Sequence, residues 1–113
     1  MKFLPERRAI ASFVDGGFRF GDHSHKGHLL ILPSGMRAWD GVDLSAVVAE
    51  ADEIDFLILG TGLKLQRIPT QLAARLQTMG ISADAMSTSA AVHSYNLMLG
   101  EARRVAAGFL AVP

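Results

Sequence analysis

Apolar residues gather in short runs along this chain, and the runs end in residues that favour turns. Residues 54 to 59 form the most apolar run, with five apolar positions leading directly into Gly60-Thr61-Gly62. A run that is apolar on both faces predicts an interior strand covered on both sides, and the glycines permit backbone angles closed to other residues. Residues 28 to 32 form a similar run before Pro33-Ser34-Gly35, which predicts a second core strand.

The N-terminal third shows the pattern of a β-hairpin or bulge. Apolar positions at 10, 13 and 14 precede Asp15-Gly16-Gly17, and Phe18-Arg19-Phe20 alternates afterwards. We therefore predict paired strands that turn at Gly16-Gly17. Trp39, the single tryptophan, follows the second apolar run among turn-forming residues, and we expect it to plug the edge of the core.

Three later segments have helical spacing. Asp43 is placed to cap a helix over residues 44 to 51, and Pro69 to start a second helix that stops at Gly80. Hydroxyl side chains at 87 to 89 precede a third helix, expected over 90 to 105. Its predicted buried stripe consists of Ala91, Tyr95, Met98, Ala102 and Val105. With short strands at 81 to 86 and 107 to 112, this alternation is typical of an α/β fold.

Composition narrows the class of protein. The 113 residues are 50% apolar and fit a single domain, residues 1 to 113. Eleven basic and eleven acidic side chains balance, so we do not expect sequence-independent binding of nucleic acid. The absence of cysteine excludes disulfides, thiol catalysis and thiolate metal sites. No signal peptide and no run near the ~18 apolar residues of a membrane span is present, so we expect a soluble, cytoplasmic protein without membrane insertion.

The glycine loop is the first candidate site. If the strands ending at Gly60 and Met86 are parallel, their following loops meet at the sheet edge where open α/β sheets bind ligands. Thr61, Thr88 and the amides near Ala90 then converge on a place that suits a phosphate or carboxylate, with Lys64 or Arg67 adding positive charge. The alternative is a tight turn, because the loop lacks the third glycine of a dinucleotide motif and matches no P-loop.

Other polar residues are weaker candidates. His23, His25 and His28 lie beside Asp22, and alternate histidines on a strand can share a metal, but we interpret them as solvated loop residues and predict no metal. Tyr95 lies on the apolar stripe and is expected in the core. Neighbouring His93 and Ser94 point about 100° apart on a helix, so they form no dyad. We predict no catalytic residue and no cofactor, and an enzyme is the less favoured interpretation.

A resemblance covers nearly the whole chain. The residues that carry it recur in order: Asp15-Gly16-Gly17-Phe18-Arg19-Phe20, Pro33, Trp39, Gly60-Thr61-Gly62, Pro69, Met86 with Thr88, Tyr95-Asn96, and Glu101 with Arg103. They resemble the Mth938-like family that includes mitochondrial respiratory complex I assembly factor three. The resemblance implies a three-layer α/β fold, with a mixed five-stranded sheet and an extra N-terminal β layer, and no established chemistry. Ser87, Ser94 and Ala102 depart from the family pattern.

The favoured function is a scaffold or assembly factor that acts through protein contacts, with a respiratory-complex subunit or another assembly factor as the implied partner. Arg19, Arg103 and Arg104 are the candidate contact residues, because transient interfaces favour arginine anchors. The alternative is a small-anion or small-ligand binding protein, or a cryptic enzyme. Its candidate ligand-binding residues are Gly60, Thr61, Gly62, Thr88, Tyr95 and Asn96. The sequence leaves the oligomeric state open.

Overall fold

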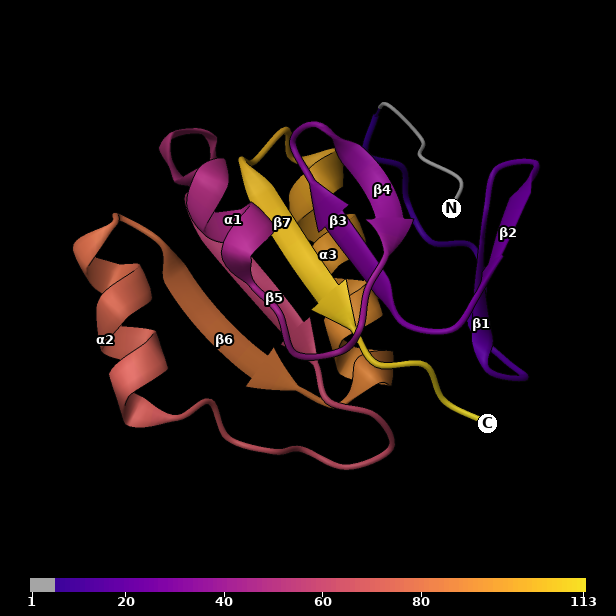
Figure 1. Cartoon of the computed structure of the whole chain (residues 1–113). Coiled ribbons are helices and arrows are strands. Elements are labelled where there is room, and N and C mark those ends of the chain that lie inside the picture. The colour runs from indigo at the N-terminus through magenta and orange to yellow at the C-terminus, as the bar shows by residue number, and fades with distance from the viewer. Residues whose placement is uncertain (1–5) are drawn as a thin grey trace.

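The computed structural model describes residues 6–113 and contains two sheets and three α-helices in that range (Figure 1). In chain order the elements are β1 (Gly17–Phe20), β2 (His23–Lys26), β3 (Leu29–Leu32), β4 (Gly35–Ala38), α1 (Ser45–Ala49), a 3-10 turn (Ala51–Glu53), β5 (Phe56–Gly60), α2 (Thr70–Thr78), β6 (Ser82–Met86), α3 (Thr88–Gly100) and β7 (Val105–Phe109).

The larger sheet is mixed and has the strand order β4-β3-β7-β5-β6. β5 is parallel to both β6 and β7, whereas β3 is antiparallel to β7 and β4. The predicted interior strand is confirmed, since β5 lies between two neighbours. Because β3 is antiparallel to both β4 and β7, these two strands run in the same direction. The carboxyl ends of β4, β5, β6 and β7 therefore share one edge of the sheet, called here the carboxyl edge.

Each face of this sheet packs on its own apolar cluster. β3 shows why, because its four residues are all buried and alternate between the two faces. Leu29 and Ile31 join a cluster with α3 and the β1–β2 hairpin, whereas Leu30 and Leu32 join a cluster with α1 and α2. Figure 1 shows α1 in front of the sheet and α3 behind it. The predicted three-layer α/β architecture with an added hairpin layer is confirmed.

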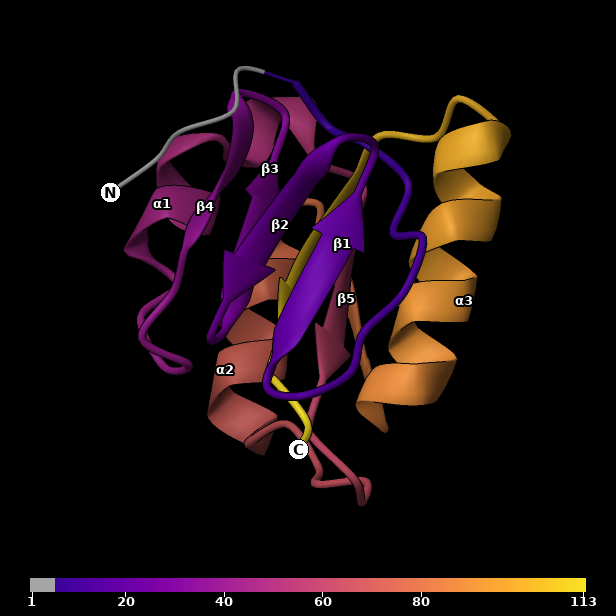
Figure 2. The same cartoon turned by 90° about the vertical axis from the view of Figure 1, so that its right-hand side faces the viewer.

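The hairpin layer differs in detail from the predicted one. β1 pairs with β2 rather than with the preceding segment, so the hairpin turns at Gly21 and Asp22. The predicted pairing around Gly16-Gly17 survives as one bridge between Ser12 and Arg19, where the Arg19 N–H donates to the Ser12 carbonyl at 2.8 Å. The segment His23-Ser24-His25-Lys26 gives only a weak strand signal in the sequence, because its apolar content is low. Figure 2 shows this hairpin as a separate layer beside α3.

The first two helices lie close to their predicted positions. α1 is shorter than expected and has Leu44 at its N-cap, so Asp43 is not the cap residue. The Asp43 carboxylate nevertheless accepts the Ser45 N–H at 2.9 Å. α2 begins after Pro69, and Gly80 has a positive φ of 82°, as its predicted role in stopping the helix requires.

The third helix is the main correction. It ends at Gly100, five residues before the predicted end, and Val105 belongs to β7. Ala102 adopts a φ of +57°, its N–H donates to the Leu99 carbonyl, and the Arg103 N–H donates to the Met98 carbonyl. These two bonds form a Schellman motif, which ends a helix. The sequence pattern concealed it because alanine occupies the left-handed position, where glycine is usual. Ala102 is therefore exposed and not part of the buried stripe.

Candidate functional site

The glycine loop and the start of α3 meet at the carboxyl edge, as predicted, and Thr88 joins them. Its side chain is fully buried, accepts the Gly62 N–H at 2.9 Å and donates to the Leu110 carbonyl at 2.7 Å. The Thr88 N–H in turn donates to the Gly62 carbonyl at 2.8 Å. One threonine thus ties the loop after β5 to the segment after β7, and its hydroxyl already has protein partners.

Thr61 stabilises the same loop from the other side. Its N–H donates to the Met86 carbonyl at 2.8 Å, and its hydroxyl lies 2.7 Å from the Lys64 carbonyl and accepts the Gln66 N–H at 3.0 Å. The Thr61 N–H and hydroxyl, which an anion would need, are therefore already engaged within the protein. Gly60 is required for packing, since a Cβ there would lie about 3.0–3.1 Å from Phe109, Ala91 and Thr88.

A cleft of about 160 Å³ opens beside this loop. Gly60 and Thr61 line it, together with exposed Arg67 and half-buried apolar residues. Those apolar residues are Trp39, Leu59, Ile68, Leu72 and Leu110. Trp39 packs on Gly108, where an added Cβ would lie 2.8 Å from its ring, and it is half-buried against the cluster of α1 and α2, so it plugs the edge of the core as predicted.

The hydrogen bonds of Tyr95 and Asn96 go to the N-terminal segment and not to the glycine loop. The Tyr95 hydroxyl donates to the Arg8 carbonyl at 2.8 Å, and burial raises the pKa of this tyrosine above its ordinary value. The Asn96 amide accepts the Ile10 N–H at 2.7 Å and donates to the Ile10 carbonyl at 2.9 Å. Together they clamp residues 8 to 10 along α3. Their ligand-binding role stays a prediction, and sequence reasoning missed this clamp because its partners are backbone atoms about 86 residues away.

The three candidate arginines have different surroundings. Arg104 makes a bidentate pair with Asp55, both N–O distances being 3.2 Å. Arg103 lies over the Phe56 ring, 5.4 Å from its centroid, and 3.5 Å from Glu101. Arg19 is exposed on β1, in the hairpin layer. Among residues 6–113, no hydrogen bond or ion pair links Arg19 to the other two.

The histidines are not simply solvated, which corrects their interpretation. The Ala111 N–H donates to His28 Nδ1 at 2.9 Å, and His25 Nε2 lies 2.8 Å from the His28 carbonyl, to which it donates. The ring of His28 also packs near Gly41. His28 therefore holds the C-terminal segment next to β3, and His25 binds the backbone of His28. Within residues 6–113, no group of three or more histidine or acidic side chains has an arrangement that would hold a metal.

Sequence reasoning missed a second cleft, of about 340 Å³, between α1 and α2. Leu72 lines this cleft and also the one beside the glycine loop, so the two clefts adjoin at Leu72. We call the combined feature the α2 groove. One wall comes from residues 39–48 and the other from residues 67–76. Leu72 and Leu76 lie four residues apart, a helical spacing that carries no information about how far apart α1 and α2 lie.

Solved structures with this arrangement define the class of protein. A structure from Bartonella henselae, named an outer membrane protein, matches with a TM-score of 0.92 and 42% identity, over 97% of this chain and 99% of that one. A Mth938-like domain from Bordetella pertussis matches with a TM-score of 0.77 and 19% identity, over 92% and 85% of the two chains. The protein is therefore an α/β domain of the Mth938-like fold.

The family follows from the sequence match. The model of the family described as "Protein of unknown function (DUF498/DUF598)" matches residues 10–110, and this chain belongs to that family. NADH dehydrogenase (ubiquinone) 1 alpha subcomplex assembly factor 3 of Danio rerio is 25% identical over 112 residues, covering 92% of this chain and 64% of the zebrafish protein. The resemblance drawn from the sequence is thus confirmed. Within residues 6–113, no helix combines the length and apolar character needed to cross a bilayer.

Proposed function

We propose that this chain is a soluble assembly or scaffold factor that acts through protein contacts. The relationship to a zebrafish protein named as an assembly factor of NADH dehydrogenase supports this class of function. A respiratory-complex subunit or another assembly factor is the corresponding partner class, and cytoplasmic localisation is part of the proposal. The observation that carries it is the set of exposed apolar side chains at the carboxyl edge.

Exposed apolar side chains gather at the carboxyl edge, beside a loop whose main polar groups have partners within the protein. Val42, Leu63 and Leu65 follow strands that end there, and their exposed fractions are 81%, 74% and 59%. The Gly62 N–H and the Thr88 hydroxyl beside them already have protein partners. Exposed apolar side chains gathered on one surface favour contact with another macromolecule. An anion site would show the reverse arrangement, with free donors and few exposed leucines.

Affinity capture tests this proposal. The endogenous chain should retain specific proteins, and a Leu63→Ser/Leu65→Ser variant should lose most of them. Leu97→Ser is the matched control, because Leu97 is 58% exposed but lies on α3. Retention of nothing above background by the wild-type chain, or equal recovery by all three proteins, would contradict the proposal.

Arg19, Arg103 and Arg104 remain proposed contact residues on a separate surface. Arginine anchors suit transient interfaces, and all three are exposed. Because Arg103 and Arg104 also have intramolecular partners, their alanine variants need a melting control. If this surface contributes, the triple alanine variant should recover fewer partners than the wild type while its melting remains cooperative.

The second candidate function is binding of a small anion in the cleft beside the glycine loop. The observation in its favour is that Arg67 and the Gly60-Thr61 segment line the same 160 Å³ cleft. A thermal-shift screen of phosphate, sulfate, nucleotides and small carboxylates tests it. Stabilisation that disappears in Arg67→Ala is the expected result. No shift with any of these at millimolar concentration would contradict the candidate.

A further inference from the structure

We propose that the α2 groove binds an acidic, amphipathic α-helix of a partner protein. This inference rests on the proposed function, because it specifies how one protein contact is made. The groove has a wall from residues 39–48, a wall from residues 67–76, and two adjoining clefts of about 340 and 160 Å³. Each cleft is large enough to receive apolar side chains of a partner.

The groove is lined by apolar side chains that the fold leaves half-buried. Leu44 and Val48 face Leu72 across the larger cleft, and Trp39 and Ile68 line the smaller one. None of these five is fully covered within the chain. A partner that covers them removes further apolar surface from water, which is the main favourable term in most protein association.

The 39–43 segment is held in place before any partner arrives. Asp40 accepts the Val42 and Asp43 N–H groups at 2.8 and 2.7 Å, and the Trp39 indole N–H donates to the Asp43 carbonyl at 2.8 Å. Gly41 supplies the positive φ, 89°, that this tight turn requires. A wall already ordered in the free protein lowers the conformational cost of binding.

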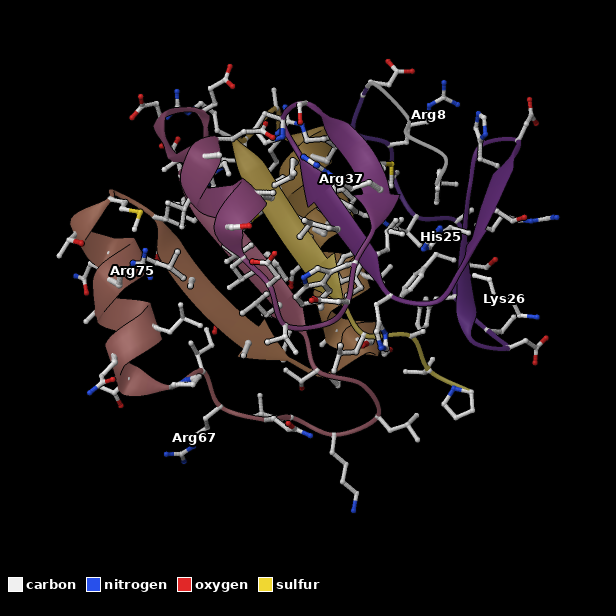
Figure 3. The ribbon with its side chains drawn as sticks, viewed as in Figure 1. Arg8, His25, Lys26, Arg37, Arg67 and Arg75 are labelled. Carbon is white, nitrogen blue, oxygen red and sulfur yellow. The ribbon has the colours of Figure 1, made fainter. Side chains whose placement is uncertain are left out.

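Charge identifies the chemistry of the partner. Arg67 and Arg75 are exposed on the α2 wall, and within residues 6–113 neither side chain makes an ion pair or hydrogen bond with another residue (Figure 3). The opposite wall carries Asp43, whose carboxylate oxygens lie 2.9 Å from the Ser45 N–H and 3.1 Å from the Ser45 hydroxyl. These bonds come from neutral groups and leave Asp43 charged, so the α2 wall is positive and the opposite wall carries the negative charge of Asp43. A complementary partner presents acidic side chains beside its apolar ones.

The shape of the groove favours a helix over an extended strand. Strand addition requires a free sheet edge with unpaired backbone groups, whereas both walls here present mainly side chains of α1, α2 and the 39–43 turn. A helix whose apolar residues recur every three or four positions places its anchors along one line, as two adjoining clefts require. Its acidic positions then lie beside Arg67 and Arg75.

Two synthetic amphipathic helices provide a direct probe. Both are about 18 residues long and have the same leucine and alanine face, but one carries glutamate and the other lysine on its polar face. We expect the acidic peptide to bind at least about tenfold more tightly. Its amide shift changes in NMR spectra should fall on residues 39–48 and 67–76. Equal affinities, or shift changes centred elsewhere, would overturn the proposal.

Charge-reversal variants test whether the acidic peptide binds at the groove or is attracted by the overall charge of the protein. Arg67→Glu/Arg75→Glu should weaken binding of the acidic peptide at least about tenfold and restore some binding of the basic one. Arg8→Glu/Lys26→Glu is the matched control, since it changes the net charge equally but lies in the N-terminal segment and on β2. It should change the affinity less than about threefold. An equal loss in both variants would overturn the proposal.

Site-specific photo-crosslinking identifies the occupant in cells. A photoreactive residue at Val42 should form an adduct with an acidic amphipathic segment of a partner, identified by peptide sequencing, whereas one at Leu97 should not. Adducts to lipid or to a second copy of the chain, or adducts from Leu97 alone, would overturn the groove assignment. Affinity capture with the endogenous chain separates the groove proposal from the proposed function. If capture finds specific partners but Val42 forms no adduct, only the groove proposal is refuted. If neither method finds a partner, the proposed function is refuted as well.

Discussion

The two faces of the central sheet are covered in different ways. On one face, α3, the hairpin and the N-terminal segment form a closed layer, sealed by hydrogen bonds from Tyr95 and Asn96 to the backbone of residues 8 to 10. On the other face, α1 has only five residues, and the space between it and α2 remains open as the α2 groove. Polar side chains stabilise the fold on the closed face, whereas on the open face two arginines have no partner within residues 6–113.

This difference indicates where function is to be sought. Three candidate ligand-binding residues from the sequence, Thr88, Tyr95 and Asn96, have intramolecular hydrogen-bond partners. Arg67 was considered in the sequence only as a charge beside the glycine loop and Arg75 was not considered, but both line the open groove. A polar residue with satisfied hydrogen bonds contributes to stability, and one without partners at a cleft is available for binding.

The largest expected effect comes from disrupting β5, an interior strand of the sheet whose two faces are compared. Leu57 is fully buried on β5, so Leu57→Asp places an unpaired charge in the core and should abolish the cooperative thermal transition. Leu63→Asp is the control, because Leu63 is 74% exposed and should change stability by less than about 0.5 kcal/mol. Circular dichroism melting measures both. A soluble Leu57→Asp protein with a cooperative transition would show that β5 is not the core strand.

A second experiment compares the closed and open faces directly. Asn96→Ala removes two hydrogen bonds and leaves the half-buried Ile10 N–H and carbonyl without their partner, so it should lower the free energy of unfolding by about 1–3 kcal/mol. Arg67→Ala on the open face should change it by less than about 0.5 kcal/mol. Hydrogen exchange should show faster exchange at residues 10 to 12 in Asn96→Ala. Equal effects of the two variants would remove the distinction between the faces.

Most of the fold was predictable, because it depends on local patterns. The apolar runs at 54 to 59 and 28 to 32 predicted β5 and β3, and Pro69 with Gly80 predicted α2. The site was less predictable, because its geometry depends on distances between elements. Nothing near Asn96 in the sequence indicates that its partner is Ile10, and no periodicity reveals the gap between α1 and α2. The end of α3 was missed because Ala102 takes a conformation that alanine rarely adopts.

The left-handed conformation of Ala102 suggests a stabilising substitution at the end of α3, on the closed face. Ala102 occupies the left-handed position of the Schellman motif with a φ of +57°, which costs about 1–2 kcal/mol for a residue with a Cβ. Glycine avoids this strain but has more freedom in the unfolded chain, worth about 0.4–1 kcal/mol. Ala102→Gly should therefore raise the free energy of unfolding by about 0.5–1 kcal/mol, measured by urea denaturation. Ala90→Gly, at an exposed helical position, should instead lower it.

The smallest expected effect concerns the wall of the open groove. Backbone N–H groups of Asp43 and Val42 donate to the Asp40 carboxylate and hold its pKa below the ordinary value. A lowered pKa in the folded state means that the carboxylate favours folding above the unfolded pKa, and this contribution is lost as the pH falls through the folded pKa. The 39–43 turn should therefore loosen at acidic pH, while the clamp at Asn96, which has no ionisable group, should not.

NMR titration measures this difference between the two faces. The Val42 and Asp43 amide shifts should move together with the Asp40 carboxyl carbon as the pH falls, and the Ile10 amide should stay unchanged over the same range. Asp40→Asn keeps a side-chain acceptor but cannot titrate, so it should abolish the transition at Val42 and Asp43. If those amides still titrate in Asp40→Asn, another group controls the wall of the groove. If the Asp40 pKa lies at or above its ordinary value, the carboxylate does not order the turn, and the pre-formed wall on which helix binding depends has a different cause.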